Sequence, residues 1–144
     1  MSNLKKIKFI KKKIISHPKG NIIKFIKKND SNYSQFGEIY FTWIKINNFK
    51  GWKFHKKMHM NLTVPVGSVN FFFYDEVSNK KLVFNLSEKK LGTLYVPPKI
   101  WFGFKNISKK KDSLVANFSN IIHDKNESVN KDFKSLQNSL IKAV

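Results

Sequence analysis

The sequence predicts an all-β fold of about eight short strands, arranged as a sandwich or barrel and followed by one C-terminal helix. Apolar and polar side chains alternate along residues 50–75, which is the period of a β-strand. Other segments rich in β-branched and aromatic residues recur along the chain, separated by turns that contain Pro, Gly, Asn or Ser. A jelly roll, in which two sheets curl around a central cavity, fits this pattern best.

The central stretch, residues 50–75, has apolar residues at nearly all of its even positions and polar residues at the odd ones. One face of the strand is therefore expected to be buried, while the other collects histidines, lysines and an amide. Lys56 is out of phase, so we expect a turn near Lys56–Lys57, and two strands joined there could exchange the faces that they bury. Gly67 and Ser68 interrupt the alternation, which then resumes up to Asp75.

The remaining elements follow from the same criteria. Residues 1–16 alternate lysine with Leu, Ile and Phe, which suits either a basic amphipathic helix or, as we prefer, a first strand with a loose basic lead. Further strands are expected at Asn21–Lys27, Phe36–Asn47, Lys81–Leu86, Gly92–Val96, Trp101–Asn106 and Ser113–Ser119. Apolar residues then recur at helical spacing, which predicts a helix over residues 130–144 with Asn130 as its N-cap.

The totals indicate one domain. A chain of 144 residues with 41% hydrophobic residues fits a single packed core. It has no cysteine, and no apolar run approaches the roughly 20 residues that span a bilayer. The lysine-rich N-terminus lacks the continuous apolar region of a secretory signal, so we expect a cytoplasmic protein with no membrane partner.

The net charge of +19 raises the question of nucleic-acid binding. All 28 basic residues are lysines, so arginine, which is favoured for base readout, is absent. The lysines are also spread along the chain among many Asn and Ile residues, as expected of a coding sequence rich in A and T. We therefore expect no nucleic-acid partner, although the charge would attract an anionic substrate such as a diphosphate.

Two segments resemble the two motifs of the cupin superfamily. The first segment supplies Gly51, Lys53-Phe54-His55, His59 or Met60, and Gly67, at about the spacing of the first motif. The second segment, Pro97–Asn106, matches the second motif at its first and last residues. The resemblance implies a double-stranded β-helix (cupin jelly roll) over residues 17–125, preceded by the lead at 1–16 and followed by the helix at 130–144.

Within that superfamily, the chain resembles the branch of dTDP-4-dehydrorhamnose 3,5-epimerases and dTDP-4-keto-6-deoxyhexose 3,4-ketoisomerases. The resemblance lies at Lys50-Gly51, Leu94–Trp101 and Asn117–Asp124. The catalytic histidine of that branch falls on Lys53, while His55 matches the second histidine of the ketoisomerases. The branch's Tyr-Tyr-Asp appears here as Ile122-His123-Asp124, without the tyrosine acid.

The resemblance implies a function, which is epimerisation or isomerisation of a dTDP-linked 4-keto-6-deoxy sugar for surface polysaccharide (lipopolysaccharide) synthesis. It also implies a homodimer and no cofactor. Proton abstraction beside a ketone needs a base, a cation for the enolate oxygen and an acid. The candidates for these three roles are His55, Lys53 and His123, respectively. The candidates for substrate binding are Lys50, Lys57, His59, Asn61, Trp101 and Phe102.

Simpler interpretations stand beside these roles. His55 and His59 could lie on a solvated strand face, the lysines could be surface residues, and Trp101 and Phe102 could belong to the core. We expect no metal site, because Lys53 and Phe102 occupy two of the ligand positions of a cupin. The alternative function is that of a non-catalytic cupin that binds a sugar nucleotide.

Overall fold

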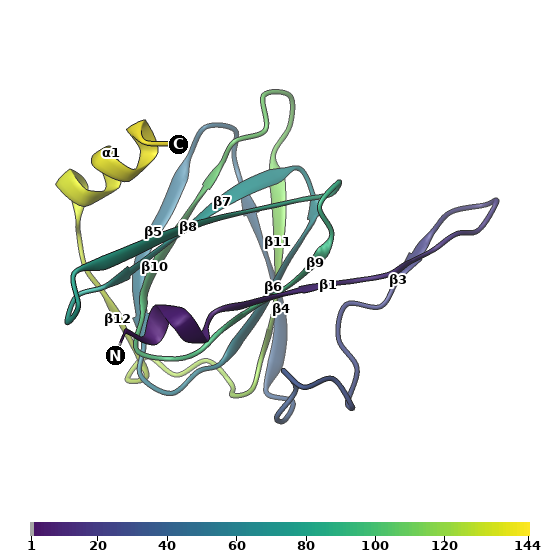
Figure 1. Cartoon of the computed structure of the whole chain (residues 1–144), viewed down its shortest axis with the longest axis horizontal. Helices are drawn as coiled ribbons and strands as arrows, with labels where there is room; N and C mark the ends of the chain where they lie inside the picture. The colour runs from purple at the N-terminus through teal and green to yellow at the C-terminus, as the bar shows by residue number, and fades with distance from the viewer. Residues whose placement is uncertain (1) are drawn as a thin grey trace.

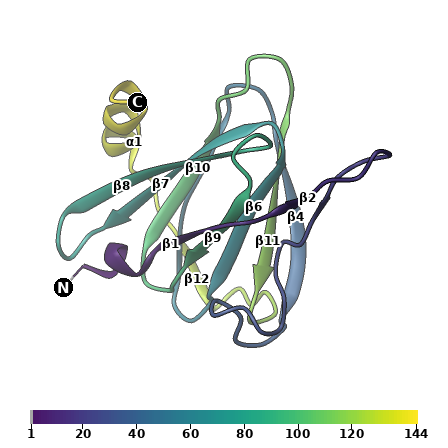
Figure 2. The same ribbon diagram turned by 45° about the vertical axis from the view of Figure 1, so that its right-hand side comes forward.

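The computed structural model describes residues 2–144 and shows two five-stranded antiparallel sheets that face each other (Figures 1 and 2). The first sheet has the order β1 (Lys8–Lys11), β9 (Gly92–Val96), β6 (Met60–Val66), β11 (Ser113–Ser119), β4 (Glu38–Ile44). The second has the order β12 (Ser128–Asn130), β5 (Phe49–His55), β10 (Trp101–Asn106), β7 (Ser68–Asp75), β8 (Lys80–Ser87). The other elements are the 3-10 helix η1 (Asn3–Lys6), the hairpin β2 (Ile14–Ile15) and β3 (Ile22–Ile23), and the helix α1 (Lys134–Lys142).

The expected order of strands is confirmed along the body of the chain. Strands β9, β10 and β11 have the bounds predicted from the sequence, and β4 lies within the segment Phe36–Asn47. The central stretch forms β5, β6 and β7, with a turn at residues 56–59 and a break at Gly67.

The first strand expected within residues 1–16 is present as β1, which pairs with β9 at the edge of the first sheet. Two other expectations need correction. The predicted strand Asn21–Lys27 is reduced to Ile22–Ile23, which pairs only with β2. Asn130 is not an N-cap: residues 128–130 pair with β5 as β12, and the helix begins at Lys134 with Phe133 at its N-cap.

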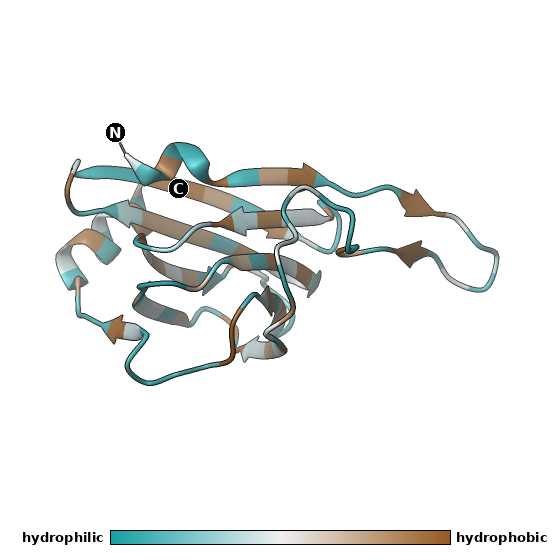
Figure 3. Cartoon of the chain, turned by 90° about the horizontal axis from the view of Figure 1, so that it is seen from below, coloured by the Kyte–Doolittle hydropathy of each residue, from teal (hydrophilic) through white to brown (hydrophobic). Residues whose placement is uncertain are grey.

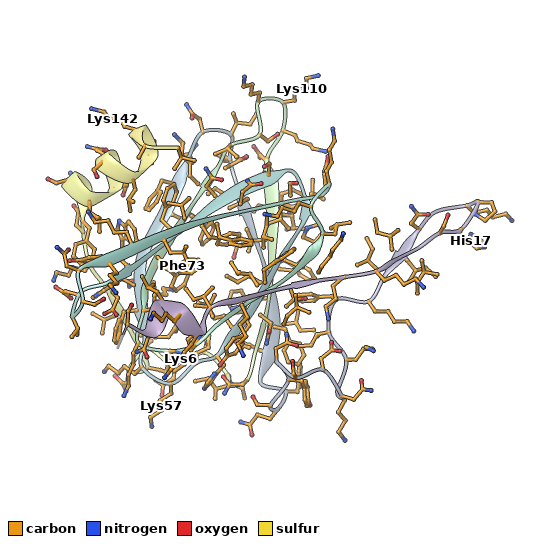
Figure 4. The ribbon with its side chains drawn as sticks, viewed as in Figure 1. Lys6, His17, Lys57, Phe73, Lys110 and Lys142 are labelled. Carbon is orange, nitrogen blue, oxygen red and sulfur yellow. The ribbon has the colours of Figure 1, made fainter. Side chains whose placement is uncertain are left out.

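The main core lies between the two sheets. Alternating residues of β7, such as Val69, Phe71 and Phe73, are fully buried there, and the Phe73 side chain is seen between the sheets in Figure 4. Met60, Leu62 and Val64 of β6 face them from the first sheet. The period of two in the sequence therefore corresponds to burial against the opposite sheet.

A second, smaller core lies on the outer side of the second sheet, beneath α1. Its buried members are Trp52, Phe72, Trp101 and Leu140. The chain is hydrophobic on both faces of β7 for this reason: Phe71 and Phe73 point to the main core and Phe72 to the smaller one.

Strand β5 changes the direction of its side chains at a bulge. Its pairing with β10 shifts between Phe102 and Gly103, so that Trp52 is an extra residue on β5. Gly51 has a φ of 140°, a region that favours glycine. The apolar Trp52 and Phe54 consequently point outward to the smaller core, and the polar Lys53 and His55 point inward.

Among residues 2–144, no helix is both long enough and apolar enough to cross a membrane.

Candidate active site

A cavity of about 610 Å³ lies between the two sheets. Strands β4, β6 and β11 line it from one side, β5 and β10 from the other, and the link between β12 and α1 contributes its last wall. Its polar or charged lining residues are Tyr40, Thr42, Lys50, Lys53, Asn117, Asn130, Lys131 and Asp132. The remaining lining residues are glycine or apolar, so the cavity combines a hydrophobic floor with a ring of polar groups, as ligand sites do.

His55 lies on the inward face of β5, just behind this lining, and is only 3% exposed. Its ring stacks on that of Phe102, which does line the cavity, at 5.6 Å between ring centroids. Its Nδ1 is 2.7 Å from Oε2 of Glu127, while its Nε2 is buried and has no hydrogen-bond partner among residues 2–144. This is a histidine held at one nitrogen and left free at the other.

Glu127 is itself fixed in place. Its other oxygen, Oε1, accepts hydrogen bonds from the backbone N–H groups of Lys57 and Met58, both at 2.8 Å. Because Oε2 must then accept from the imidazole, Nδ1 carries the hydrogen and Nε2 has a free lone pair. The pair is assembled from the end of β5 and the loop before β12, 72 residues further along the chain.

Burial sets the protonation of this pair. Desolvation lowers the pKa of His55 below its usual value, against the opposing effect of Glu127, so the neutral imidazole is favoured. Burial acts to raise the pKa of Glu127, but the hydrogen bonds from the Lys57 backbone, from His55 and from the Met58 backbone together lower it. A neutral histidine beside an ionised carboxylate is the state that can accept a proton at Nε2.

Lys50 and Lys53 place cationic side chains on the cavity wall. They lie opposite Phe104 and Phe102 in the pairing of β5 with β10. Lys131, in the link to α1, also lines the cavity, but its ammonium pairs with Glu76 at 2.9 Å and lies over the Phe133 ring of the smaller core. The cavity is thus well suited to an anionic ligand.

Tyr40 and Asn117 form a polar pair on the opposite wall, which the sequence interpretation did not assign. Asn117 Nδ2 donates to the Tyr40 hydroxyl oxygen at 2.7 Å, and the Asn117 Oδ1 atom is buried without a partner in the part of the chain that the structure describes. Burial raises the pKa of the Tyr40 hydroxyl, which keeps it protonated. Along β4, Tyr40 and Thr42 alternate with apolar residues, and this alternation could have predicted an inward polar face. Glu127 lies in a loop, where no periodic pattern could have predicted its role.

Two of the predicted site residues are exposed. The His123 side chain is exposed, and its backbone N–H donates to Glu38 Oε1 at 2.8 Å; the residue does not line the cavity. Lys57 lies in an exposed loop (Figure 4) and touches the site through its backbone N–H alone.

Three other predicted binding residues lie outside the cavity. His59 and Asn61 are on the outer side of the first sheet, where His59 Nδ1 is 2.7 Å from the Tyr95 hydroxyl and Asn61 bonds to Asn32. Trp101 belongs to the smaller core and donates its indole N–H to Glu76 at 3.0 Å. Of the substrate-binding candidates, Lys50 and Phe102 line the cavity.

Within residues 2–144, no group of three or more His, Cys, Asp or Glu side chains comes together in a way that could hold a metal ion.

The WxcM-like, C-terminal family (FdtA) matches residues 5–138 of the sequence. The chain belongs to this family. No curated protein sequence matches it.

Several solved structures are similar to this chain. A dTDP sugar isomerase from Desulfovibrio desulfuricans G20 is 26% identical, with a TM-score of 0.86 over 94% of this chain and 90% of that one. The 3,4-ketoisomerase QdtA from Thermoanaerobacterium thermosaccharolyticum, a mutant solved with TDP-4-keto-6-deoxyglucose, is 19% identical (TM-score 0.73, 94% of both chains). A dTDP-4-dehydrorhamnose 3,5-epimerase from Sulfolobus tokodaii is 18% identical, with a TM-score of 0.77 over 89% of this chain and 81% of that one. The expected fold, a cupin jelly roll with a short C-terminal helix, is confirmed.

Proposed function

We propose that this chain is a nucleotide-sugar isomerase, either an epimerase or a ketoisomerase, that acts on a dTDP-4-keto-6-deoxyhexose. The family match and the similarity to a dTDP sugar isomerase support the substrate class. The observation that carries the chemistry is the neutral His55, held by Glu127 at Nδ1 and free at Nε2. A non-catalytic binder, the alternative from the sequence, would not need a buried base with this arrangement.

The reaction begins at His55. Its Nε2 takes the proton from the carbon next to the ketone; the electron pair of that C–H bond forms a C=C bond to the carbonyl carbon, and the carbonyl π pair moves onto the oxygen to give an enolate. Phe102 covers one face of the imidazole and lines the cavity, so the Phe102 ring has to move for the sugar to reach Nε2. The Lys53 ammonium, on the same inward face of β5, holds the enolate oxygen.

The proton is then returned to carbon by an acid. Tyr40 suits this role, because Asn117 donates to its oxygen and leaves the phenol hydrogen free for the substrate. His123, the candidate from the sequence, lies outside the cavity and is retained as the competing acid. Lys50 would hold the diphosphate.

The place of this reaction in the cell follows from the same proposal. The product would supply surface-polysaccharide synthesis, lipopolysaccharide included, and the enzyme would act in the cytoplasm as a homodimer without a cofactor.

Exchange of solvent deuterium into dTDP-4-keto-6-deoxyglucose, followed by mass spectrometry, tests the proposal. The wild-type chain should incorporate deuterium next to the ketone, and the H55A chain should not. Lys53→Met should slow exchange far more than Lys57→Met, its matched control on the exposed loop. Tyr40→Phe and His123→Ala distinguish the two candidate acids. The variant that still exchanges deuterium but no longer forms product is the one that lacks the acid. Thermal stabilisation by the sugar without any exchange in the wild-type chain would contradict the proposal and favour the binder.

A further inference from the structure

Two turns lie side by side at one end of the molecule, one between β4 and β5 (residues 45–48) and one between β10 and β11 (residues 107–112). They are the blue and green loops at the top of Figure 1, and they are adjacent in Figure 2 as well. We call the segments 45–48 and 105–112 the tip. Lys110, which belongs to the tip, points away from the body of the molecule in Figure 4. Residues 46–47 and 105–109 line a hollow of about 390 Å³ between the two turns.

The two turns of the tip are fixed to each other by hydrogen bonds. Asn106 is fully buried, and its Nδ2 donates to the carbonyl of Ile44 at 2.9 Å, just before the first turn. Its backbone N–H donates to the carbonyl of Asn48 at 3.1 Å. Asp112 Oδ1 accepts a hydrogen bond from the backbone N–H of Ile46, also at 3.1 Å. The side chains on the two turns are therefore presented together, as one surface.

Two isoleucines are exposed on this surface. Ile46 is 42% exposed and Ile107 is 40% exposed, and both line the hollow. Most connecting loops of the chain are hydrophilic (Figure 3), whereas here an apolar side chain stands on each of two neighbouring turns. Transfer of this apolar pair from water to a hydrocarbon environment is favourable.

Lysines surround the two isoleucines. The tip contains five lysines and a single acidic residue, Asp112. Lys111 pairs with Glu88 at 2.8 Å. Within residues 2–144 the other four form no ion pair: Lys45, Lys105, Lys109 and Lys110. An apolar pair ringed by free ammonium groups is complementary to a surface that has negative charge outside and hydrocarbon beneath it.

We propose that the tip docks on a membrane surface that contains anionic phospholipids. Ile46 and Ile107 enter the boundary between headgroups and acyl chains, the lysines contact lipid phosphates, and the hollow receives a headgroup phosphate. A nucleic acid would also attract the lysines, but it offers no hydrocarbon layer for the isoleucines. The sequence analysis expected no membrane partner because no segment spans a bilayer, and a peripheral contact of this kind needs no such segment.

The tip adjoins the candidate active site. Lys105 of the tip lies opposite Phe49, and the next pair along β10 and β5 is Phe104 with Lys50, both of which line the cavity. Docking at the tip would therefore hold the cavity close to the membrane surface. The docking residues take no part in the proposed reaction, so the two proposals stand or fall separately.

Co-sedimentation with vesicles at physiological salt is the first test. The wild-type chain should bind vesicles of phosphatidylcholine mixed with phosphatidylglycerol, and it should not bind vesicles of phosphatidylcholine alone. The double variant I46S/I107S should lose about tenfold or more in affinity, because it removes the apolar pair. K109Q/K110Q should lose on the order of 20-fold, since each lysine near an anionic surface contributes a factor of about five.

Matched controls separate the tip from the overall charge of the chain. V77S/I122S removes two exposed apolar side chains outside the tip, 99% and 71% exposed. K5Q/K6Q removes two exposed lysines of η1, away from the tip in Figure 4. Both controls should bind within a small factor of the wild-type chain, and circular dichroism checks that every variant is folded. Absence of vesicle binding, unchanged binding by I46S/I107S, or an equal loss in K5Q/K6Q would overturn the proposal.

A fluorescent label is the second test, and it uses the absence of native cysteine. A polarity-sensitive fluorophore on Ile107→Cys should emit at shorter wavelength when the anionic vesicles are added, because the label enters the boundary region. The same fluorophore on Val77→Cys should not respond. A label at position 107 that stays in water would contradict the proposal. Tighter binding of a short DNA duplex than of the vesicles, lost in K109Q/K110Q, would assign the tip to nucleic acid instead.

Discussion

At the scale of single residues, the site depends on His55, which is buried and hydrogen-bonded to the carboxylate of Glu127. The inward face of β5 carries His55, and the loop before β12 supplies the carboxylate of Glu127 that orients it. Without this partner, a buried imidazole could carry its hydrogen on either ring nitrogen. The carboxylate fixes the tautomer, and burial keeps the ring neutral.

Glu127→Gln tests the orientation of His55. The glutamine oxygen would still accept from the Lys57 and Met58 backbones, so its NH₂ group would face Nδ1 of His55 and donate to it. The imidazole hydrogen would then move to Nε2 and remove the base. We expect kcat for deuterium exchange to fall on the order of 10⁴-fold, the size of effect known for a wrong tautomer in a catalytic triad, with KM little changed. Glu76→Gln, a surface carboxylate paired with Lys131, is the control and should keep kcat within a small factor. Equal kcat values for wild-type and Glu127→Gln would contradict the assignment.

The lowered pKa of His55 also predicts how stability depends on pH. In the unfolded chain this histidine titrates near pH 6.5, whereas in the folded chain its pKa is lower because of burial. Between these two values the unfolded chain binds more protons, so the free energy of unfolding falls as the pH drops below about 6.5. Urea unfolding across this range should show a weaker fall for His55→Gln than for the wild-type chain. An unchanged slope in His55→Gln would count against a buried neutral histidine.

At the scale of elements, the two faces of the second sheet have different tasks. Its inner face lines the cavity, and its outer face packs Trp52 and Trp101 beneath α1. A nine-residue helix is too short to be stable alone in water. Helix α1 therefore forms because its apolar side packs on the smaller core. The same packing holds the link at residues 130–132 against the cavity.

Leu140→Ala tests this dependence. Leu140 is buried against the smaller core, and its truncation should destabilise the chain by about 2–5 kcal/mol. Loss of docking should also expose Trp52 and Trp101, which shifts the tryptophan emission to longer wavelength. Asn138→Ala, an exposed position of the same helix, should change stability by no more than about 0.5 kcal/mol. Identical denaturation curves for Leu140→Ala and the wild-type chain would show that the helix is not docked as described.

At the scale of the whole molecule, the fold places part of the chain's positive charge at one cavity. The lysines are spread along the sequence, but two of them, Lys50 and Lys53, line one cavity between the sheets. A net charge of +19 would attract any polyanion, and the limited volume of the cavity is what favours a small one such as a nucleotide sugar.

Much of the fold was predictable from local patterns. Alternation located β9, β10 and β11 at their observed bounds, and the out-of-phase Lys56 located the turn between β5 and β6. These features depend on neighbours in sequence, which is why the sequence determined them. The predicted start of the helix was wrong because residues 128–130 pair with β5 as a strand. This long-range pairing outweighs the local preference of Asn130 for an N-cap.

The site was only partly predictable. The sequence by itself determined that residues 53 and 55 share a face, because they are two apart on one strand. Only the tertiary structure decided that this face is the inner one, since the bulge at Trp52 turns the apolar side chains outward under α1. It also decided which distant groups meet there, Glu127 and Tyr40 among them, and which predicted residues, such as His59 and Trp101, lie elsewhere. The physical reason is that strand periodicity is local, whereas a cavity is made by the packing of two sheets whose strands are far apart in the chain.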